Sequence, residues 1–265
     1  MKSLKIVLLQ DSATFRIPNT SGHIISYPLP MYSTVIGFLC TATGNPQKFL
    51  SKSFSLAIYS KFQTRYIEYI WYRNLYKQYH LQRFGSIDNR IYHGEFEHIG
   101  GQSPITRDRL HNVKTIIYLL ADEEAMEQIK SNLAGNVPAL HLGMAEDLVV
   151  PKNVEYVYLD EKPIEYVGKV DYYSWLPPKE ACYCLPSNYI EFLSRIAGVT
   201  CLVSTKYRLV KIHDVTIRDF SYIRARLFSP RGLPIEYNQP YKFLIDRTEN
   251  LPLWFLKIDG GGKGV

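Results

Sequence analysis

A helix without charge, placed directly behind a proline-clamped segment, constrains the fold of this chain more than any other feature. The stretch RIPNTSGHIISYPLPMYSTVIGFLCTATG (16–44) contains the extended segment YPLP (27–30) and a helical pattern over 33–43, which we expect to end at Gly44. A helix with no charged side chain favours burial all round, so we expect it in the core. Arg16 and His23 stand among small polar residues in the loop before it and are candidate binding residues.

Six segments follow one another in the order strand, helix, strand, strand, helix, strand. We expect strands at 5–9, 54–59, 113–121 and 154–159, and helices at 33–43 and 123–134. Asp122 is the expected N-cap of the second helix, and two acids follow it in the first turn. This β-α-β-β-α-β order is that of the ferredoxin-like fold, which RNA-recognition modules and many enzymes share.

Residues 61–112 interrupt this order between the second and third strands, where a hairpin connection is normally short. Such a long insertion is functional or disordered, and its many aromatic residues argue against disorder. We therefore predict an α+β fold in which residues 1–160 form a ferredoxin-like palm with an inserted, partly β-structured lobe. Residues 161–265 are expected to form a linker and a smaller β-rich C-terminal region, with a helix at 187–196 and strands at 201–210, 215–228 and 253–258.

The basic surplus of the chain lies in its first half. The net charge is +6, and residues 1–120 carry 14 Lys and Arg against 6 Asp and Glu, whereas residues 121–265 carry 17 against 19. This asymmetry favours a polyanionic partner. The alternative is a basic surface that serves solubility alone.

Cations and aromatic rings alternate at the start of the insertion. Strand alternation places five side chains on one face, namely Lys61, Arg65, Tyr69, Trp71 and Arg73. Cations on such a face suit the phosphates of a single-stranded nucleic acid, and the rings suit its bases. The alternative is an aromatic face packed on the domain, with arginines extended to its edge.

The end of the insertion carries a second basic group. Arg107 and Arg109 share a strand face, with Asp108 opposite, and Lys114 follows at the return to the core. We expect phosphate contacts from these residues, and a solvated loop is the rival interpretation. The segment 206–231 repeats the basic and aromatic alternation, which is equally typical of an edge strand charged against aggregation.

Catalytic and metal-binding patterns are weak. The chain has no Walker A loop, GxSxG or HExxH motif, and the cysteines Cys40, Cys182, Cys184 and Cys201 lack a zinc spacing. We expect no metal and no cofactor, free thiols in a reducing cytoplasm, and no membrane-spanning helix. His23, His111 and Lys114 could support a metal-independent ribonuclease if the fold brought them together.

Three segments resemble one known family. They are the stretch 16–44, with its arginine, its aromatic-Pro-x-Pro clamp and its glycine-bearing helix, the turn ALHLGMAED (139–147), and the leucine-proline pair in CLP (184–186). Together they resemble the CRISPR-associated RAMP subunit that holds the 5′ handle of the guide RNA (crRNA) in type I Cascade complexes. This is the fifth family of Cas proteins, in a form like subtype I-B.

The resemblance implies a ferredoxin-like palm, a thumb at the position of the insertion, and a cap at the 5′ end of a backbone of related subunits. The implied partners are the crRNA handle, the backbone RAMP subunits, the large subunit and, through the assembled complex, target DNA. The family's arginine falls on Arg16, and Met144 stands where the usual turn has an arginine. One branch of the family cleaves precursor crRNA with a tyrosine, a lysine and a histidine, whereas this chain resembles the non-catalytic kind. A type III RAMP subunit and a pure protein-interaction module also fit the sequence.

Overall fold

The structure is a computed structural model that describes residues 1–20, 22–73, 91–92, 95–96, 102–135, 139–163, 170–183, 189–212, 215–230 and 242–260. The first half contains β1 Lys2–Ala13, β2 Phe15–Arg16, β3 His23–Ile24, β4 Ser26–Tyr27, α1 Tyr32–Thr43, α2 Pro46–Ser51, β5 Phe54–Lys61, β6 Thr64–Arg73, β7 Ile91–Tyr92, β8 Glu95–Phe96, β9 Gln102–Leu120 and α4 Glu123–Ala134. The second half contains β10 Leu140–His141, β11 Leu148–Tyr158, β12 Asp160–Pro163, β13 Tyr173–Leu176, the 3-10 turn η3 Lys179–Ala181, β14 Cys182–Tyr183, α5 Tyr189–Arg195, β15 Thr200–Ile212, β16 Val215–Phe228, β17 Lys242–Asp246, β18 Leu251–Leu253 and β19 Phe255–Ile258.

The fold is mixed α and β and is dominated by one mostly antiparallel sheet. Its main path runs β10-β11-β1-β9-β5-β13-β16-β15. The six elements predicted from the sequence are present as β1, α1, β5, β9, α4 and β11, and the four strands among them pair antiparallel in the order β11-β1-β9-β5. Strands β1 and β9 are longer than predicted because their pairing continues beyond the apolar runs to Ala13 opposite Leu110.

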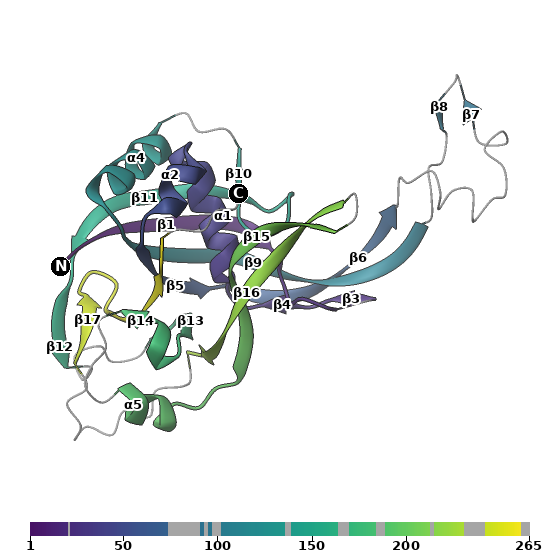
Figure 1. The fold of residues 1–265 in the computed structure, drawn as a ribbon. Coiled ribbons are helices and arrows are strands. Elements are labelled where there is room, and N and C mark those ends of the chain that lie inside the picture. The colour runs from purple at the N-terminus through teal and green to yellow at the C-terminus, as the bar shows by residue number, and fades with distance from the viewer. Residues whose placement is uncertain are drawn as a thin grey trace.

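The central strands of this sheet are buried on both faces. Along β1, Leu4 and Ile6 belong to the core cluster that contains α1 and α4, whereas Val7 belongs to a second cluster. That second cluster includes Phe192 of α5 and Trp254 near the C-terminus. The helices α1 and α4 therefore cover one face, and the C-terminal segments cover the other (Figure 1). None of the helices in the described ranges is long and apolar enough to cross a membrane.

Helix α1 departs from the expectation that it is buried all round. Val35 and Leu39 are fully buried, but Gly37 and Thr41 are exposed to solvent. Small uncharged side chains tolerate water without demanding it, so the absence of charge did not require burial on every side. The expectation was wrong for this face, and the left-handed Gly44 (φ 67°) ends the helix as expected.

The start and the end of the insertion form a two-stranded ribbon, which we call the arm. It consists of β6 and residues 102–111 of β9, in an antiparallel register that runs from Thr64 opposite His111 to Arg73 opposite Gln102. Figure 1 shows the arm extending away from the helices and the rest of the sheet. Of the remaining insertion only the short pair β7 and β8 is described. Residues 93–94, 97–101 and 74–90 of the predicted lobe lie outside the described ranges.

Candidate nucleic-acid interface

Two aromatic rings stand exposed on one face of the arm. Tyr69 and Trp71 alternate along β6, and their side chains are 60% and 56% exposed. Their ring centroids lie 6.1 Å apart at 86°, in an edge-to-face arrangement. Neither ring is used in the core, so both present flat surface to an incoming partner. Arg73 belongs to the same strand and alternation, but its side chain lies outside the described part.

The loop before α1 reaches the base of the arm on this same face. Strand β3 pairs parallel with β9, placing His23 opposite Thr106. The ring of His23 lies 2.7 Å from the Thr106 hydroxyl and 3.0 Å from Asp108 Oδ1. Asp108 is nearly buried and also accepts a hydrogen bond from the backbone N–H of Ser26 (3.1 Å). The structure thus brings the N-terminal motif and the arm together, a contact across 85 residues of sequence.

Two more of the predicted cations lie near this junction. Arg65 donates to the carbonyl of Ser26 (3.2 Å), and its Nη1 lies 3.6 Å from Asp108 Oδ2. Its side chain is 41% exposed, so one side of the guanidinium faces water. Arg16 is exposed and donates to the carbonyl of Thr20 (3.3 Å) within its own loop. Both residues remain accessible to an anion.

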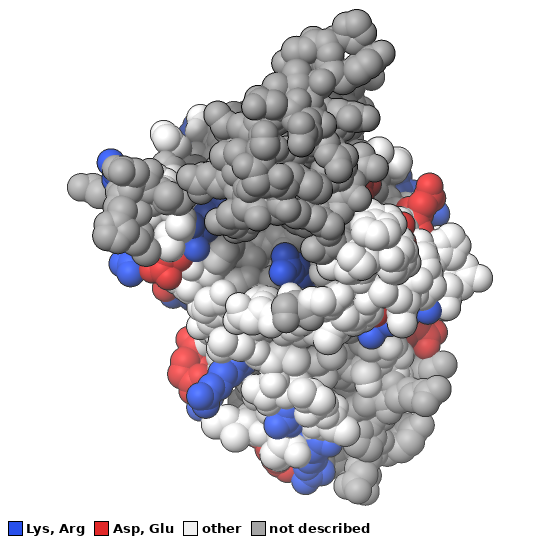
Figure 2. All heavy atoms as spheres, turned by 90° about the vertical axis from the view of Figure 1, so that its right-hand side faces the viewer, with Lys and Arg blue, Asp and Glu red and all other residues white. Residues whose placement is uncertain are grey.

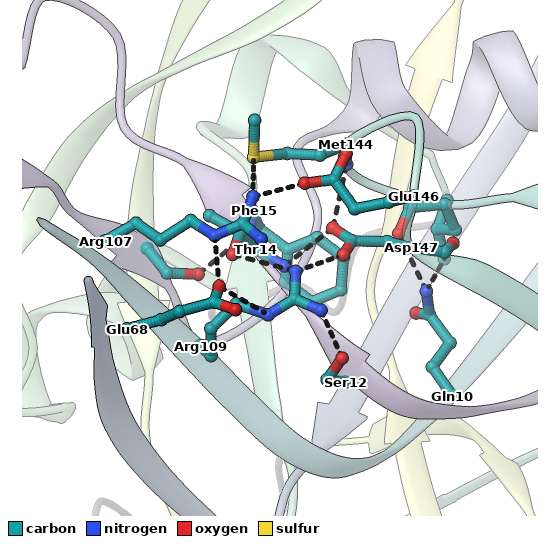
Figure 3. Close-up of polar contacts among 12 residues, drawn as sticks. Gln10, Ser12, Thr14, Phe15, Glu68, Arg107, Arg109, Met144, Glu146 and Asp147 are labelled. Atoms are coloured by element: carbon teal, nitrogen blue, oxygen red, sulfur yellow. Dashed lines mark hydrogen bonds and ion pairs between the residues drawn. The ribbon is translucent and has the colours of Figure 1, made fainter. Parts of the chain in front are cut away.

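Arg107 and Arg109 occupy the opposite face of the arm and are buried. The register places Glu68 directly across from Arg107, and paired residues share a face. Arg107 Nε lies 2.5 Å from Glu68 Oε2, and its Nη1 bonds to Glu146 and lies 3.6 Å from the sulfur of Met144. The hydrogen bond from Arg107 holds the pKa of Glu146 below its usual value. The shared face predicted from the sequence is confirmed, and acids already occupy it (Figure 3).

Asp147 is the centre of this buried cluster. It is fully buried and pairs through Oδ1 with Arg109, while Oδ2 accepts from the backbone N–H groups of Thr14 and Met144, each at 2.8 Å. Gly143 has a φ of 122°, and a Cβ there would lie 2.7 Å from Asp147 Oδ2. The turn needs glycine for both reasons. The cluster fastens the base of the arm to the turn 142–147 and to the end of β1 (Figure 3).

The remaining predicted cations contact the C-terminal region. Lys61 and Lys114 are cross-strand neighbours, and their ammonium groups lie 4.6 and 5.6 Å from the ring centroid of Tyr172. Lys114 also bonds to Glu249 at 3.0 Å. Burial alone would lower the pKa of Lys114, but the hydrogen bonds that its ammonium makes with Tyr172 and Glu249 outweigh burial and raise the pKa. Lys61 is exposed, whereas Lys114 is held in this cluster.

The sequence did not identify the acids that pair with Arg107 and Arg109. Glu68, Glu146 and Asp147 come from segments 38 to 39 residues away from the arginines that they bind. The signal for Glu146 and Asp147 was present in the turn ALHLGMAED, where a glycine and two acids follow one another. For Glu68 the only signal was its position on the same strand face as the arginines.

The candidate catalytic residues do not form one site. His23 lies at the register of Thr106, eight residues from Lys114 along β9, which corresponds to about 27 Å of strand. His111 is exposed and faces Thr64 across the ribbon. Within the described ranges, no group of three or more His, Cys, Asp or Glu is placed to hold a metal ion.

Charge on the arm side of the molecule is distributed unevenly. Figure 2 views the molecule from the side toward which the arm points. Lys and Arg side chains are spread over this face and include one in a hollow near its centre, whereas the visible Asp and Glu side chains lie toward the margins. Basic side chains are therefore spread over the side of the molecule toward which the arm points.

No protein-family model and no curated protein matches the chain. A chain of a CRISPR RNA-guided surveillance complex is similar at 13% identity over 87% of this chain and 91% of that chain, with a TM-score of 0.46. A CRISPR protein from Archaeoglobus fulgidus is similar at 14% identity over 98% and 93%, with a TM-score of 0.37. A chain of the type III-B Cmr-beta structure bound to cognate target RNA and AMPPnP is similar at 12% identity over 86% and 84%, with a TM-score of 0.39. All three TM-scores lie below 0.5, so no conclusion rests on these likenesses.

Proposed function

We propose that the chain is a non-catalytic RNA-binding subunit of a type I CRISPR (Cascade) complex, with a ferredoxin-like palm and with the arm as part of its thumb. The observation that carries RNA binding is the pair of exposed rings, Tyr69 and Trp71, on a ribbon whose base presents accessible cations. Proteins that bind single-stranded nucleic acids stack the bases on exposed aromatic rings and contact the phosphates with cations. The three sequence segments 16–44, 139–147 and 184–186 supply the link to the CRISPR family.

The contact residues of this proposal divide by their surroundings. Tyr69 and Trp71 stack bases, and the exposed arginines Arg16 and Arg65 approach phosphates. His23, Lys61 and Arg73 join them as further contacts. Arg107, Arg109 and Lys114 are paired with carboxylates, and a phosphate would have to displace these. The proposal therefore gives these three a positioning role in the first instance, although the sequence alone predicted phosphate contact.

The stacking part of the proposal is tested by fluorescence anisotropy with a CRISPR-repeat RNA. Trp71→Ala is expected to weaken binding by about 5- to 150-fold, because stacking contributes about 1–3 kcal/mol per base. Tyr158→Ala is the matched control, since this ring is 75% exposed on β11, away from the arm. Equal effects of the two substitutions, or no effect of either, would show that the arm is not part of the RNA-binding surface.

The charge part is tested by the salt dependence of the same affinity. Arg65→Ala is expected to lower the slope of log affinity against log salt by about one, as expected for one lost phosphate contact. Trp71→Ala should leave this slope unchanged while weakening binding. A slope that is the same in the wild type and in Arg65→Ala would exclude a phosphate contact by this residue.

The place in a complex is tested by co-purification. The proposed partners are the crRNA 5′ handle, the backbone RAMP subunits and the large subunit in the cytoplasm, with target DNA reached through the assembled complex. Tagged chain expressed with its neighbouring genes should recover a repeat-derived RNA and these subunits. Recovery of partner proteins without RNA would favour a pure protein-interaction module instead.

One observation favours a second candidate, a metal-independent endoribonuclease that processes precursor crRNA. The Asp108–His23 contact of 3.0 Å, with the Thr106 hydroxyl on the other ring nitrogen, is an arrangement that can orient a general base. The test is incubation of the purified chain with repeat RNA in EDTA. Specific cleavage to a 2′,3′-cyclic phosphate that is lost in His23→Ala would replace the non-catalytic proposal.

A further inference from the structure

A concave site lies away from the exposed rings of the arm. A cavity of about 500 Å³ opens between the exposed face of α1, the start of β10 and the strands β15 and β16. None of the described residues that line it belongs to β6. Its volume falls in the range of small-molecule sites, which are about 300–1,000 Å³. The arm rings and this cavity can therefore be tested separately.

The floor of the cavity contains a glycine for which the surrounding structure gives no packing or backbone reason. Gly37 stands in the middle of α1, where glycine is disfavoured relative to alanine, and its φ is not left-handed. A Cβ built on Gly37 meets no atom within 4 Å beyond its own helix. No packing or backbone requirement in the described structure keeps a side chain away from this position. A group that enters the cavity and approaches the helix backbone would provide the reason.

The wall opposite α1 combines flat rings with cations. The rings of Tyr207 and Phe220 have centroids 5.5 Å apart across the β15–β16 pair, and the guanidinium of Arg218 lies 4.9 Å from the Tyr207 centroid. Lys206 is half-buried beside them, and its ammonium bonds to the carbonyl oxygen of Asp259. Burial lowers the pKa of Lys206, and the nearby charge of Asp259 acts in the opposite direction.

The charge of the lining has one sign. Lys206 and Arg218 line the cavity with His141 from β10, and none of the described lining residues is Asp or Glu. The Asp259 carboxylate acts on Lys206 from outside the lining. Cations in a lining without a carboxylate suit an anion, and flat rings suit a planar heterocycle. A nucleotide combines both chemistries in one molecule of suitable size. An apolar helix of a partner protein would use the floor but would leave the cations without a counterpart.

We propose that this cavity is a nucleotide-binding site, with the base against Tyr207 and Phe220 and the phosphate directed to Arg218 and Lys206. Gly37 lets the ligand approach α1 closely. The site is independent of base stacking on the arm, because none of its described lining residues comes from β6. It would hold a free nucleotide or one residue of a longer strand through the same contacts.

The test is isothermal titration of the full chain with AMP, GMP, CMP and UMP as probes. At least one probe should bind saturably. Gly37→Leu places a side chain in the space in front of α1, where a Cβ meets no atom within 4 Å, and should weaken binding at least tenfold, as should Arg218→Met. Arg208→Met is the matched control, since Arg208 lies on the same hairpin outside the cavity and pairs with Asp219. This variant should bind as the wild type does.

Several results would overturn the site. They are absence of saturable binding for all four probes, equal binding by wild type and Gly37→Leu, or an amphipathic helical peptide that binds where no nucleotide does. Circular dichroism confirms the helix in each variant, and Gly37→Ala provides a milder substitution should Gly37→Leu not fold. Trp71→Ala should retain mononucleotide binding whatever its effect on repeat RNA. Failure of the arm proposal and failure of this site therefore give different results.

Discussion

Replacing Asp147 by asparagine tests whether the buried cluster at the base of the arm stabilises the fold. The substitution keeps the shape of the side chain, and the amide oxygen can still accept from the N–H groups of Thr14 and Met144. It removes the full charge that pairs with Arg109 Nη1, and Arg109 is itself only 6% exposed. Breaking a buried ion pair in this way costs about 3–5 kcal/mol. Glu68 remains 3.7 Å from Arg109 Nε and still compensates part of the charge of Arg109. We therefore expect Asp147→Asn to lower the free energy of unfolding by about 3 kcal/mol.

Urea unfolding at neutral pH measures this loss. The midpoint should fall while the m-value stays the same, and the melting temperature should drop by roughly 6–12 °C for a chain of this size. Glu146→Gln is the control, because its carboxylate pairs with Arg107 but is 48% exposed and should contribute less than about 1 kcal/mol. A loss under about 1 kcal/mol for Asp147→Asn, or one equal to the control, would refute the reasoning.

Two further stability predictions concern other parts of the molecule. Burial opposes ionisation of Glu249, but the hydrogen bond and charge of Lys114 outweigh it and lower the pKa below 4.5. A carboxyl group whose pKa is lower in the folded than in the unfolded chain stabilises the fold fully above the unfolded pKa, and this stabilisation is lost as the pH falls through the folded pKa. Glu249→Gln removes this group and should therefore flatten the pH dependence of urea unfolding between about pH 5 and 3. Gly37→Ala should raise the unfolding free energy by about 1 kcal/mol, because the site is helical and open. A destabilised Gly37→Ala variant would show that packing requires the glycine.

The secondary structure was predictable where the signal is local. Asp122 accepts from the N–H of Ala125 at 3.1 Å, which confirms the predicted N-cap, and Gly44 ends α1 as predicted. These features depend on residues within one helical turn of each other. The strand runs were found for the same reason, because apolar residues in β5 and β9 are contiguous in sequence.

The site was predictable only in part, because strand alternation gives the face of a residue and not what covers it. For Tyr69 and Trp71 the sequence left open whether their face binds a partner or packs on the domain, and both side chains are exposed. Arg107 and Arg109 were expected to share a face, which is correct, but the turn 142–147 covers that face with acids. Contacts that join segments tens of residues apart follow from the tertiary fold, which no local pattern encodes.

Three consecutive residues of β9 hold the arm from both sides. Asp108 binds the N-terminal loop on one face, while Arg107 and Arg109 bind Glu68 and the turn 142–147 on the other. Removing the two arginines would therefore change the orientation of the arm and not only its charge. If they act in this way, Arg107→Ala with Arg109→Ala weakens repeat-RNA binding with an unchanged salt slope, whereas direct phosphate contact would flatten the slope by about two. Anisotropy titrations across a range of salt concentrations separate the two roles. A flattened slope would show that these arginines contact phosphates directly.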